Sequence, residues 1–146
     1  MNKTDKIIGI FFGALLMLAF FLPWVQTGAG AIQISITGYD LVSAATKVKN
    51  FMGRDFDALT YFIFLFPITG AISILFSGIV RLPFITLFSA MATITYITVR
   101  IAYFGWDNLQ RTLNTVGLGL WISLACVVVI FANSAIQTAG GKKKKK

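Results

Sequence analysis

The side chains that carry out most protein chemistry are scarce in this sequence. It contains no histidine, one cysteine and five acidic residues among 146. Without histidine, the chain offers neither the most common metal ligand nor the side chain that most often acts as a base at neutral pH. It also has no glycine-rich phosphate loop, nucleophile elbow or Asp-rich metal motif. We therefore expect no catalytic residues, no metal site and no cofactor, and thus a protein that is not an enzyme.

The cysteine and the acidic residues lie where they offer little chemistry. Cys126 stands within the apolar run 124–128, so we expect it to be a small buried packing residue. A single cysteine also cannot form a disulfide within the chain. All five acids fall outside the long apolar segments, so no carboxylate is expected inside a membrane as a proton relay or cation site.

Four long segments of the sequence lack charged side chains, and these segments would set the positions of the cysteine and the acids. Apolar residues make up 57% of the sequence and charged residues 12%, far from the balance of a soluble domain. A helix needs about 20 residues to cross the hydrocarbon of a bilayer, and it satisfies its backbone polar groups internally. The sequence therefore predicts an all-α integral membrane protein, a four-transmembrane-helix bundle in a single domain over residues 1–139. The predicted spans are residues 7–25, 58–80, 83–104 and 110–132.

The first apolar segment has features of both a membrane span and a signal peptide. Lys3 and Lys6 precede it, and small residues follow it at 27–31, as in a cleavable signal. Because its apolar run is long for a signal peptide, we expect it to be retained as the first span. Trp24, at the end of this span, is expected at the level of the lipid headgroups.

The distribution of basic residues predicts the orientation in the membrane. Four spans put both termini on one side, together with eight of the Lys and Arg residues, against five on the other side. Cytoplasmic loops are enriched in Lys and Arg, so both termini are expected in the cytoplasm. The five lysines at the C-terminus decide this prediction, because without them the count is three against five.

The segment between the first two spans, residues 26–57, predicts a small cap outside the cytoplasm. Residues 31–37 alternate with period two, which puts three isoleucines on one face of a strand, and glycines on either side supply turns. We therefore expect an extracytoplasmic β-hairpin. Asp40 is then expected to cap a short amphipathic helix near 41–51 that lies along the membrane surface.

Two short motifs flank the strand of this cap, Leu22-Pro23-Trp24 and Thr37-Gly38-Tyr39-Asp40-Leu41. In both motifs the chain resembles many uncharacterised bacterial four-span membrane proteins, which implies a location in the bacterial inner membrane. The layout of four helices with a β-segment in the first outer loop is also similar to that of claudin-like tetraspans. The cysteine pair and Trp signature of claudins are missing here. The resemblance implies an architecture and no activity.

Small residues spaced four apart are candidates for close helix packing. Gly9 and Gly13 have this spacing in the first span, and Ser73 and Ser77 have it in the second. These faces would pack against each other within the bundle or against a neighbouring subunit.

A polar stripe marks one face of the third predicted span. Its residues are Ser89, Thr93, Tyr96 and Arg100. Such a stripe usually forms hydrogen bonds between helices, and the lining of a pore is the alternative. Arg100 is expected to extend to the outer interface or to pair with Asp107 or Asp57.

The C-terminal segment 140–146 is predicted to be a polybasic cytoplasmic tail. Its charged residues are Lys142, Lys143, Lys144, Lys145 and Lys146. Near an anionic leaflet each lysine contributes on the order of 1 kcal/mol to membrane binding. We expect contact with anionic lipid headgroups. The alternative is contact with an acidic surface of a protein or of RNA. Of these two, the protein is favoured over the nucleic acid.

Two functions remain open on the sequence. The first is a non-catalytic accessory or scaffold subunit that packs in a larger membrane assembly, with other membrane subunits or with copies of itself. The second is a channel or transporter-type pore formed by an oligomer, because four short helices do not easily enclose a conduit. The scarcity of charge within the predicted spans favours the first function, and the polar stripe favours the second.

Overall fold

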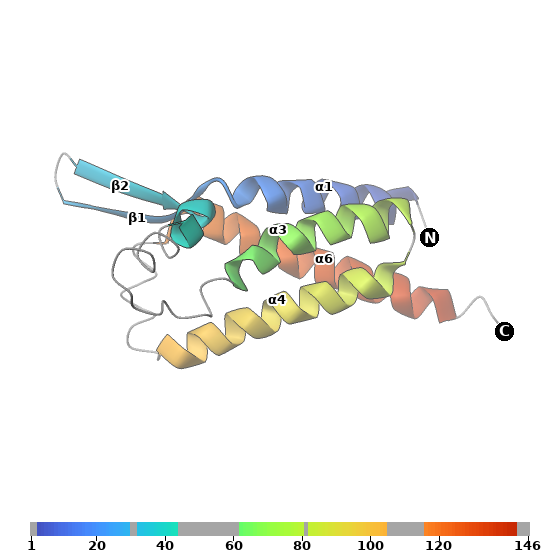
Figure 1. Ribbon diagram of the computed structural model, residues 1–146. Helices are drawn as coiled ribbons and strands as arrows, with labels where there is room; N and C mark the ends of the chain where they lie inside the picture. Colours follow the sequence, from blue (N-terminus) through green and yellow to red (C-terminus); the bar gives the residue numbers. More distant parts are fainter. Residues whose placement is uncertain (1–2, 30–31, 44–61, 81, 105–115, 143–146) are drawn as a thin grey trace.

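The computed structural model describes residues 3–29, 32–43, 62–80, 82–104 and 116–142. Four helical segments lie side by side along one axis, and a two-stranded sheet projects from one end (Figure 1). The helices are α1 (Lys3–Ala19), α3 (Leu65–Ile72) with its continuation as the π-helix η2 (Ser73–Ile79), α4 (Pro83–Phe104) and α6 (Leu118–Lys142). The strands are β1 (Pro23–Ala29) and β2 (Ile32–Thr37).

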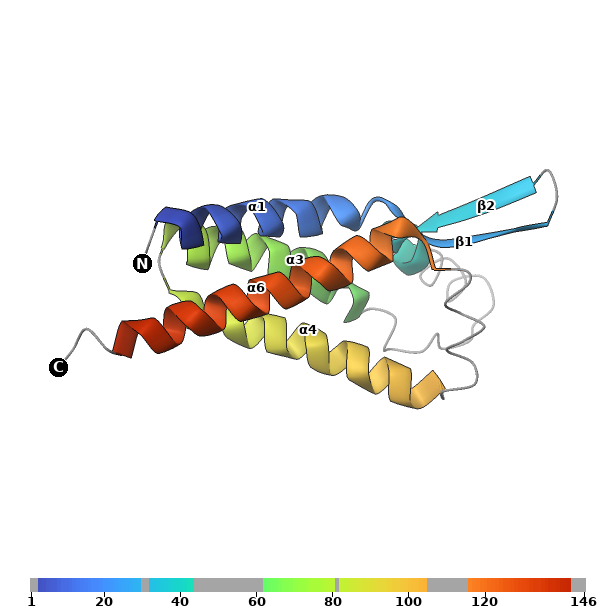
Figure 2. The ribbon, with the colours of Figure 1, turned by 180° about the vertical axis from the view of Figure 1, so that it is seen from behind.

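Successive helical segments run in opposite directions along the bundle. Both ends of the chain therefore lie at the end opposite the sheet (Figures 1 and 2). α1 packs against α3, η2 and α6, and α4 packs against the same three elements. The order around the bundle is thus α1, α3, α4 and α6, with α1 and α4 on one diagonal. The described residues confirm the predicted helical bundle with a small β-hairpin.

Two of the helices are long and apolar enough to cross a membrane. They are Pro83–Ala102 and Leu118–Gly140, with mean hydropathies of 1.5 and 2.1. The segment Phe62–Ser77 is apolar but shorter. By length and composition, the first two segments could each span the hydrocarbon of a bilayer.

The first helix ends earlier than predicted, at Ala19 rather than at 25. The backbone N–H groups of Phe21 and Leu22 each donate to the carbonyl three residues earlier, which tightens the final turn. Pro23 has no N–H group with which to continue the helix. The side chain of Trp24 folds back and donates its indole N–H to the carbonyl oxygen of Ala19 at 2.9 Å. The last part of the predicted first span is therefore an extended strand.

The helix after β2 is capped by a different residue from the one predicted. It begins at Gly38 and is described as far as Ser43. The hydroxyl of Thr37 accepts a hydrogen bond from the backbone N–H of Asp40, and the carboxylate of Asp40 accepts one from the N–H of Thr37, both at 3.1 Å. This reciprocal pair is a capping box, so Thr37 is the cap and Asp40 is its partner. The rest of the predicted helix, 44–51, lies outside the described residues.

The second helical segment changes type along its length. A 3₁₀ turn at 62–64 leads into α3, and α3 continues as η2, whose hydrogen bonds join residues five apart. The N–H of Val80 donates to the carbonyl oxygen of Leu75 at 2.7 Å in this pattern. α4 then follows with the bounds that the sequence predicts for that helix. The predicted start of the second span, at 58, lies outside the described residues.

The last helix begins and ends later than predicted. Gly117 donates its backbone N–H to the carbonyl oxygen of Trp24 at 2.7 Å, and the residue before it pairs with β1 in a β-bridge. The chain is therefore still extended at this point, and α6 begins at Leu118 rather than at 110. At its other end α6 passes through 140–142, which the sequence placed in a tail, instead of ending near 132. Residues 143–146 lie outside the described residues.

Hydrogen bonds to α1 hold the late turns of α6 in place. The side-chain amides of Asn133 and Gln137 both donate to the carbonyl oxygen of Asp5, at 3.0 and 3.3 Å. These two residues are four apart and so share one face of the helix. Their bonds to α1 account for the continuation of α6 beyond its predicted end.

The interior of the bundle is partly polar, and its surface is largely apolar. Phe20, Trp24, Phe66 and Leu16 belong to an apolar cluster, which includes Cys126, buried as expected. Eight polar residues are also buried in the described part of the chain: Thr69, Ser73, Ser77, Thr86, Thr93, Ser123, Asn133 and Ser134. Large apolar side chains are exposed on every long helix. Apolar surface of this extent is typical of proteins that contact lipid or another protein.

Candidate functional site

The predicted small-residue pairs face each other where α1 meets the second helical segment. A Cβ atom at Gly13 would lie 2.7 Å from the carbonyl oxygen of Gly70, and one at Gly9 would lie 2.9 Å from the Cβ of Ser77. The hydroxyl of Ser73 donates to the carbonyl oxygen of Gly9 at 2.8 Å. The helix backbones can approach this closely only because the residues are small. Both faces are used inside the chain and are not available to a neighbouring subunit.

The predicted polar stripe of α4 is divided between the interior and the outer surface. The hydroxyl oxygen of Thr69, on α3, lies 2.8 Å from that of Ser89 and 2.8 Å from that of Thr93. Tyr96 instead stacks its ring on Phe62, with the ring centroids 6.1 Å apart. Ser89 and Thr93 therefore tie α4 to α3, which favours a role in packing over the lining of a pore.

Of the remaining predicted site residues, the structure describes Arg100 and places Lys142 at the end of α6. Arg100 is partly exposed near the sheet end of α4, and the two acids predicted to pair with it, Asp57 and Asp107, lie outside the described residues. Lys142 ends α6 at the end that carries the termini. Arg100 and Lys142 therefore lie at opposite ends of the bundle, and the lysines at 143–146 lie outside the described residues.

The motifs Leu22-Pro23-Trp24 and Thr37-Gly38-Tyr39-Asp40-Leu41 lie close together at the end of the bundle that carries the sheet. Trp24 is only 4% exposed, and its ring lies edge-on to the rings of Phe20 and Phe66, with centroids 5.9 and 4.9 Å away. A Cβ atom at Gly38 would lie 2.8 Å from the ring of Phe20. Trp24 is thus buried in the protein, and its indole N–H finds a partner there, the carbonyl of Ala19; its predicted level in the membrane stays a prediction.

Two glycines hold the start of α6 against the same motif. A Cβ atom at Gly117 would collide with the carbonyl oxygen of Pro23, and one at Gly119 would lie 2.8 Å from the Cβ of Leu22. The backbone of α6 therefore contacts the backbone of the Leu22-Pro23-Trp24 segment directly. This motif joins α1, the hairpin and α6, and its role in the described structure is architectural.

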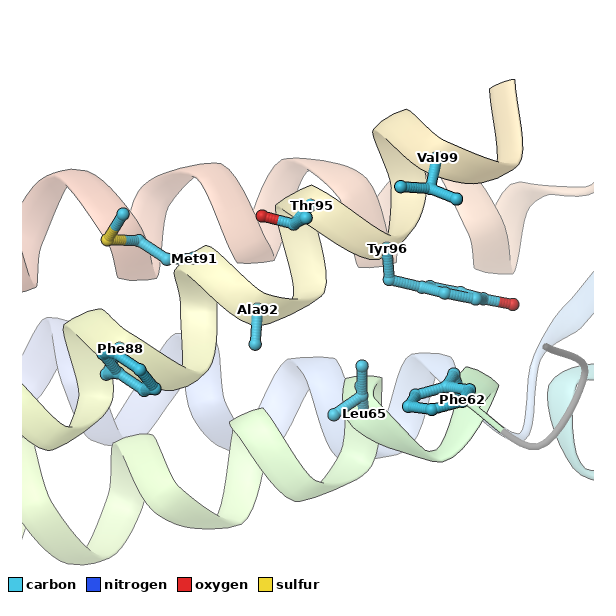
Figure 3. A pocket seen from close by; sticks show the side chains of 8 residues that line it. All are labelled: Phe62, Leu65, Phe88, Met91, Ala92, Thr95, Tyr96 and Val99. Atoms are coloured by element: carbon cyan, nitrogen blue, oxygen red, sulfur yellow. The ribbon is translucent and has the colours of Figure 1, made fainter. Parts of the chain in front are cut away.

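An apolar groove lies between α4 and the second helical segment, on the outside of the bundle (Figure 3). Its volume is about 500 Å³. The groove is lined by Phe62, Leu65, Phe88, Met91, Ala92, Thr95, Tyr96 and Val99. Figure 3 shows Phe88 toward one end, Phe62 and Tyr96 toward the other, and the small side chain of Ala92 between them. Of these residues, sequence reasoning singled out only Tyr96.

The groove has an apolar lining without charge. Its lining offers two hydroxyl groups, on Thr95 and Tyr96, and no charged side chain. Within the described residues, no group of three or more His, Cys, Asp or Glu is placed to hold a metal ion. Comparison with protein-family models, with curated proteins and with solved structures found no match for this chain.

Proposed function

We propose that this chain is an integral membrane protein whose four helical segments all cross the bilayer. The support is the exposed surface, because every segment presents large apolar side chains outward. Examples are Phe11 on α1, Ile68 on α3, Phe88 on α4 and Ile136 on α6. In a water-soluble bundle such residues would face the core and polar residues would cover the outside. Here several polar residues face inward instead.

In the proposed orientation, both termini lie in the cytoplasm and the hairpin lies outside it. The positions of the two chain ends support this, since they share one end of the bundle. The resemblance of the Leu-Pro-Trp and Thr-Gly-Tyr-Asp-Leu motifs favours the bacterial inner membrane. The five C-terminal lysines would then lie beside the anionic cytoplasmic leaflet and bind its headgroups.

Cysteine labelling in intact cells tests this topology. Lys3 and Gln26 are both exposed, at the start of α1 and on β1. In a Cys126→Ala background, we expect a membrane-impermeant maleimide to label Gln26→Cys from outside the cell and Lys3→Cys only after permeabilisation. Labelling of Lys3→Cys in intact cells would reverse the orientation. Equal labelling of both variants only after lysis would show that the chain does not cross the membrane as proposed.

Within the membrane, the function that the geometry supports best is that of a non-catalytic accessory subunit. We infer that it binds an apolar transmembrane helix of a partner protein in the groove between α3 and α4. The groove is the observation that carries this inference. It is open, apolar and uncharged, and the small-residue faces of α1 and η2 are already used inside the chain.

The side chains of the groove are arranged as helix packing requires. Ala92 and Thr95 are small and lie at the middle of the α4 side, whereas Phe88 lies toward one end and Val99 toward the other. Residues three and four apart form one ridge along a helix, so these four positions present a continuous strip. Small residues at the centre of such a strip allow a second helix to approach closely in lipid.

A photo-crosslinking amino acid at Ala92 tests this function in the native membrane. We expect a single discrete adduct with another membrane protein, identified by mass spectrometry. The matched control is the same amino acid at Ile136, which is 67% exposed on α6 and does not line the groove. It should give lipid adducts only. An adduct with a second copy of this chain, or lipid adducts alone at Ala92, would contradict a hetero-subunit function.

A further inference from the structure

Four buried polar atoms have no hydrogen-bond partner among the described residues. They are the hydroxyl oxygens of Ser77, Thr86 and Ser134 and the amide oxygen of Gln137. The three hydroxyl-bearing residues are fully buried, with 0% of their surface exposed. All four lie in the half of the bundle that carries the termini, on η2, the first turns of α4 and the late turns of α6.

Neighbouring contacts place these groups at one level of the bundle. A Cβ atom at Gly9 would lie 2.9 Å from the Cβ of Ser77 and 3.8 Å from the Nδ2 of Asn133, so η2 and α6 meet α1 at the same height. Ser134 follows Asn133 directly in the sequence.

The level of Thr86 along the bundle follows from the contact between α3 and α4. Thr93 of α4 is hydrogen-bonded to Thr69 of α3. Thr86 lies two turns before Thr93, and Ser77 lies about two turns after Thr69. Because the two segments run in opposite directions, these steps of about 10–12 Å lead to the same level. Ser77 and Thr86, both fully buried, therefore lie at the same level of the bundle interior, toward the end that carries the termini.

Other hydroxyl groups in these helices are satisfied by their own backbone. Thr93, Ser123 and Thr138 each donate to the carbonyl oxygen four residues earlier. Thr86, in the first turn of α4, makes no such bond to its own helix, and its buried hydroxyl has no partner among the described residues.

The three hydroxyl groups and the amide oxygen are suited to bind a small neutral molecule. Hydroxyl groups donate and accept hydrogen bonds, and the amide oxygen of Gln137 accepts them. None of the four groups is charged, and an ion without a counter-charge in a buried site is strongly disfavoured. A buried water molecule typically makes about three hydrogen bonds to polar groups that would otherwise be unsatisfied.

We propose that Ser77, Thr86 and Ser134 form an internal water-binding site between η2, α4 and α6. The half-buried Gln137, three residues after Ser134 on α6, carries the fourth unpartnered atom and would add an acceptor at the edge of this site. The site stands apart from the groove and from the membrane topology, and it does not depend on the proposed function.

Substitutions that remove one hydroxyl at a time test the site in the full-length protein. Thr86→Val keeps the volume of the side chain, and we expect it to lower the unfolding temperature by roughly 2–6 °C, because the bound water loses a partner. Ser77→Ala should act in the same direction. The double variant should fall short of the sum of the two shifts, because both side chains hold the same water. The matched control is Ser123→Ala, which is equally buried but bonded to its own helix and should change the unfolding temperature less.

Different results are expected if the site holds no water. If the site holds no water, the hydroxyl groups are unsatisfied, and Thr86→Val leaves the unfolding temperature unchanged or raises it. Strictly additive shifts would also contradict a shared water. A measurement on the unmodified protein covers the case in which a variant does not fold. We expect nuclear Overhauser contacts between long-lived water and the protons of Ser77 or Thr86, and their absence would overturn the proposal.

Discussion

Gly13→Ala is expected to destabilise the bundle strongly, and Gly13→Leu is expected to prevent it from folding. The added methyl group would lie 2.7 Å from the carbonyl oxygen of Gly70 and 2.9 Å from the Cγ1 of Ile74. A backbone carbonyl cannot rotate away as a side chain can, so α1 and α3 would have to separate. Overpacking of this kind typically costs about 1–3 kcal/mol, and here the adjoining Ser73–Gly9 hydrogen bond would be strained as well.

Thermal unfolding of the purified protein in mild detergent measures this effect. The control is Gly140→Ala, because a Cβ atom at Gly140 would meet nothing within 4 Å. Alanine favours the helix over glycine, so the control should leave the unfolding temperature unchanged or slightly raised. The two variants make the same chemical change and differ only in what surrounds it. If Gly13→Ala unfolds at the temperature of the control, the close contact between α1 and α3 does not exist.

Trp24→Ala is expected to have the second large effect, a loss of about 3–5 kcal/mol of stability. The substitution removes the edge-on contacts with Phe20 and Phe66 and the hydrogen bond to the carbonyl of Ala19. Trp24→Phe separates these contributions, because it keeps an aromatic ring and loses only the N–H donor together with part of the volume. We expect it to recover a large part of the stability that Trp24→Ala loses.

Trp121 supplies the control for this experiment. It lies on α6 and is 51% exposed, so Trp121→Ala should change the stability of the detergent-solubilised protein little. Equal losses for Trp24→Ala and Trp121→Ala would show that Trp24 is not part of the core. The measurement thereby distinguishes the buried position of Trp24 from the headgroup position that the sequence predicts.

The close-packing residues could be identified from the sequence because their pattern is local. Gly9 and Gly13 share a helix face through their spacing alone, as do Ser73 and Ser77. The spacing does not say which face they meet, because that depends on the order of the helices around the bundle. The structure places the two pairs opposite each other on α1 and η2.

The helix ends were harder to predict, because the bonds that set them join distant residues. The apolar run continues past Ala19 without interruption, and nothing local shows that Trp24 will turn back onto that residue. The late start of α6 follows from the pairing of Gly117 with Trp24. The capping box is different. Thr37 and Asp40 have its spacing in the sequence, so this cap could have been read directly.

The groove and the internal water site could not be predicted from the sequence. Phe88 and Phe62 come from different helices, and only the packing of α3 on α4 leaves space between them. The buried hydroxyls likewise look ordinary in the sequence, since most serine and threonine residues in helices bond to their own backbone. Their lack of partners depends on how η2 and α6 each pack beside α1 and α4, which joins residues far apart in the sequence.

The contact between Gly117 and the Leu22-Pro23-Trp24 segment has a consequence for the synthesis of the chain. The two bonded residues, Trp24 and Gly117, are about 90 residues apart, and a ribosome adds about 5–20 residues per second. The end of α1 therefore waits roughly 5–20 s for its last contact. During this interval the nascent protein has α1 and the hairpin but lacks the α6 backbone that packs against the segment between them. A chain truncated before Gly117 would never gain this contact.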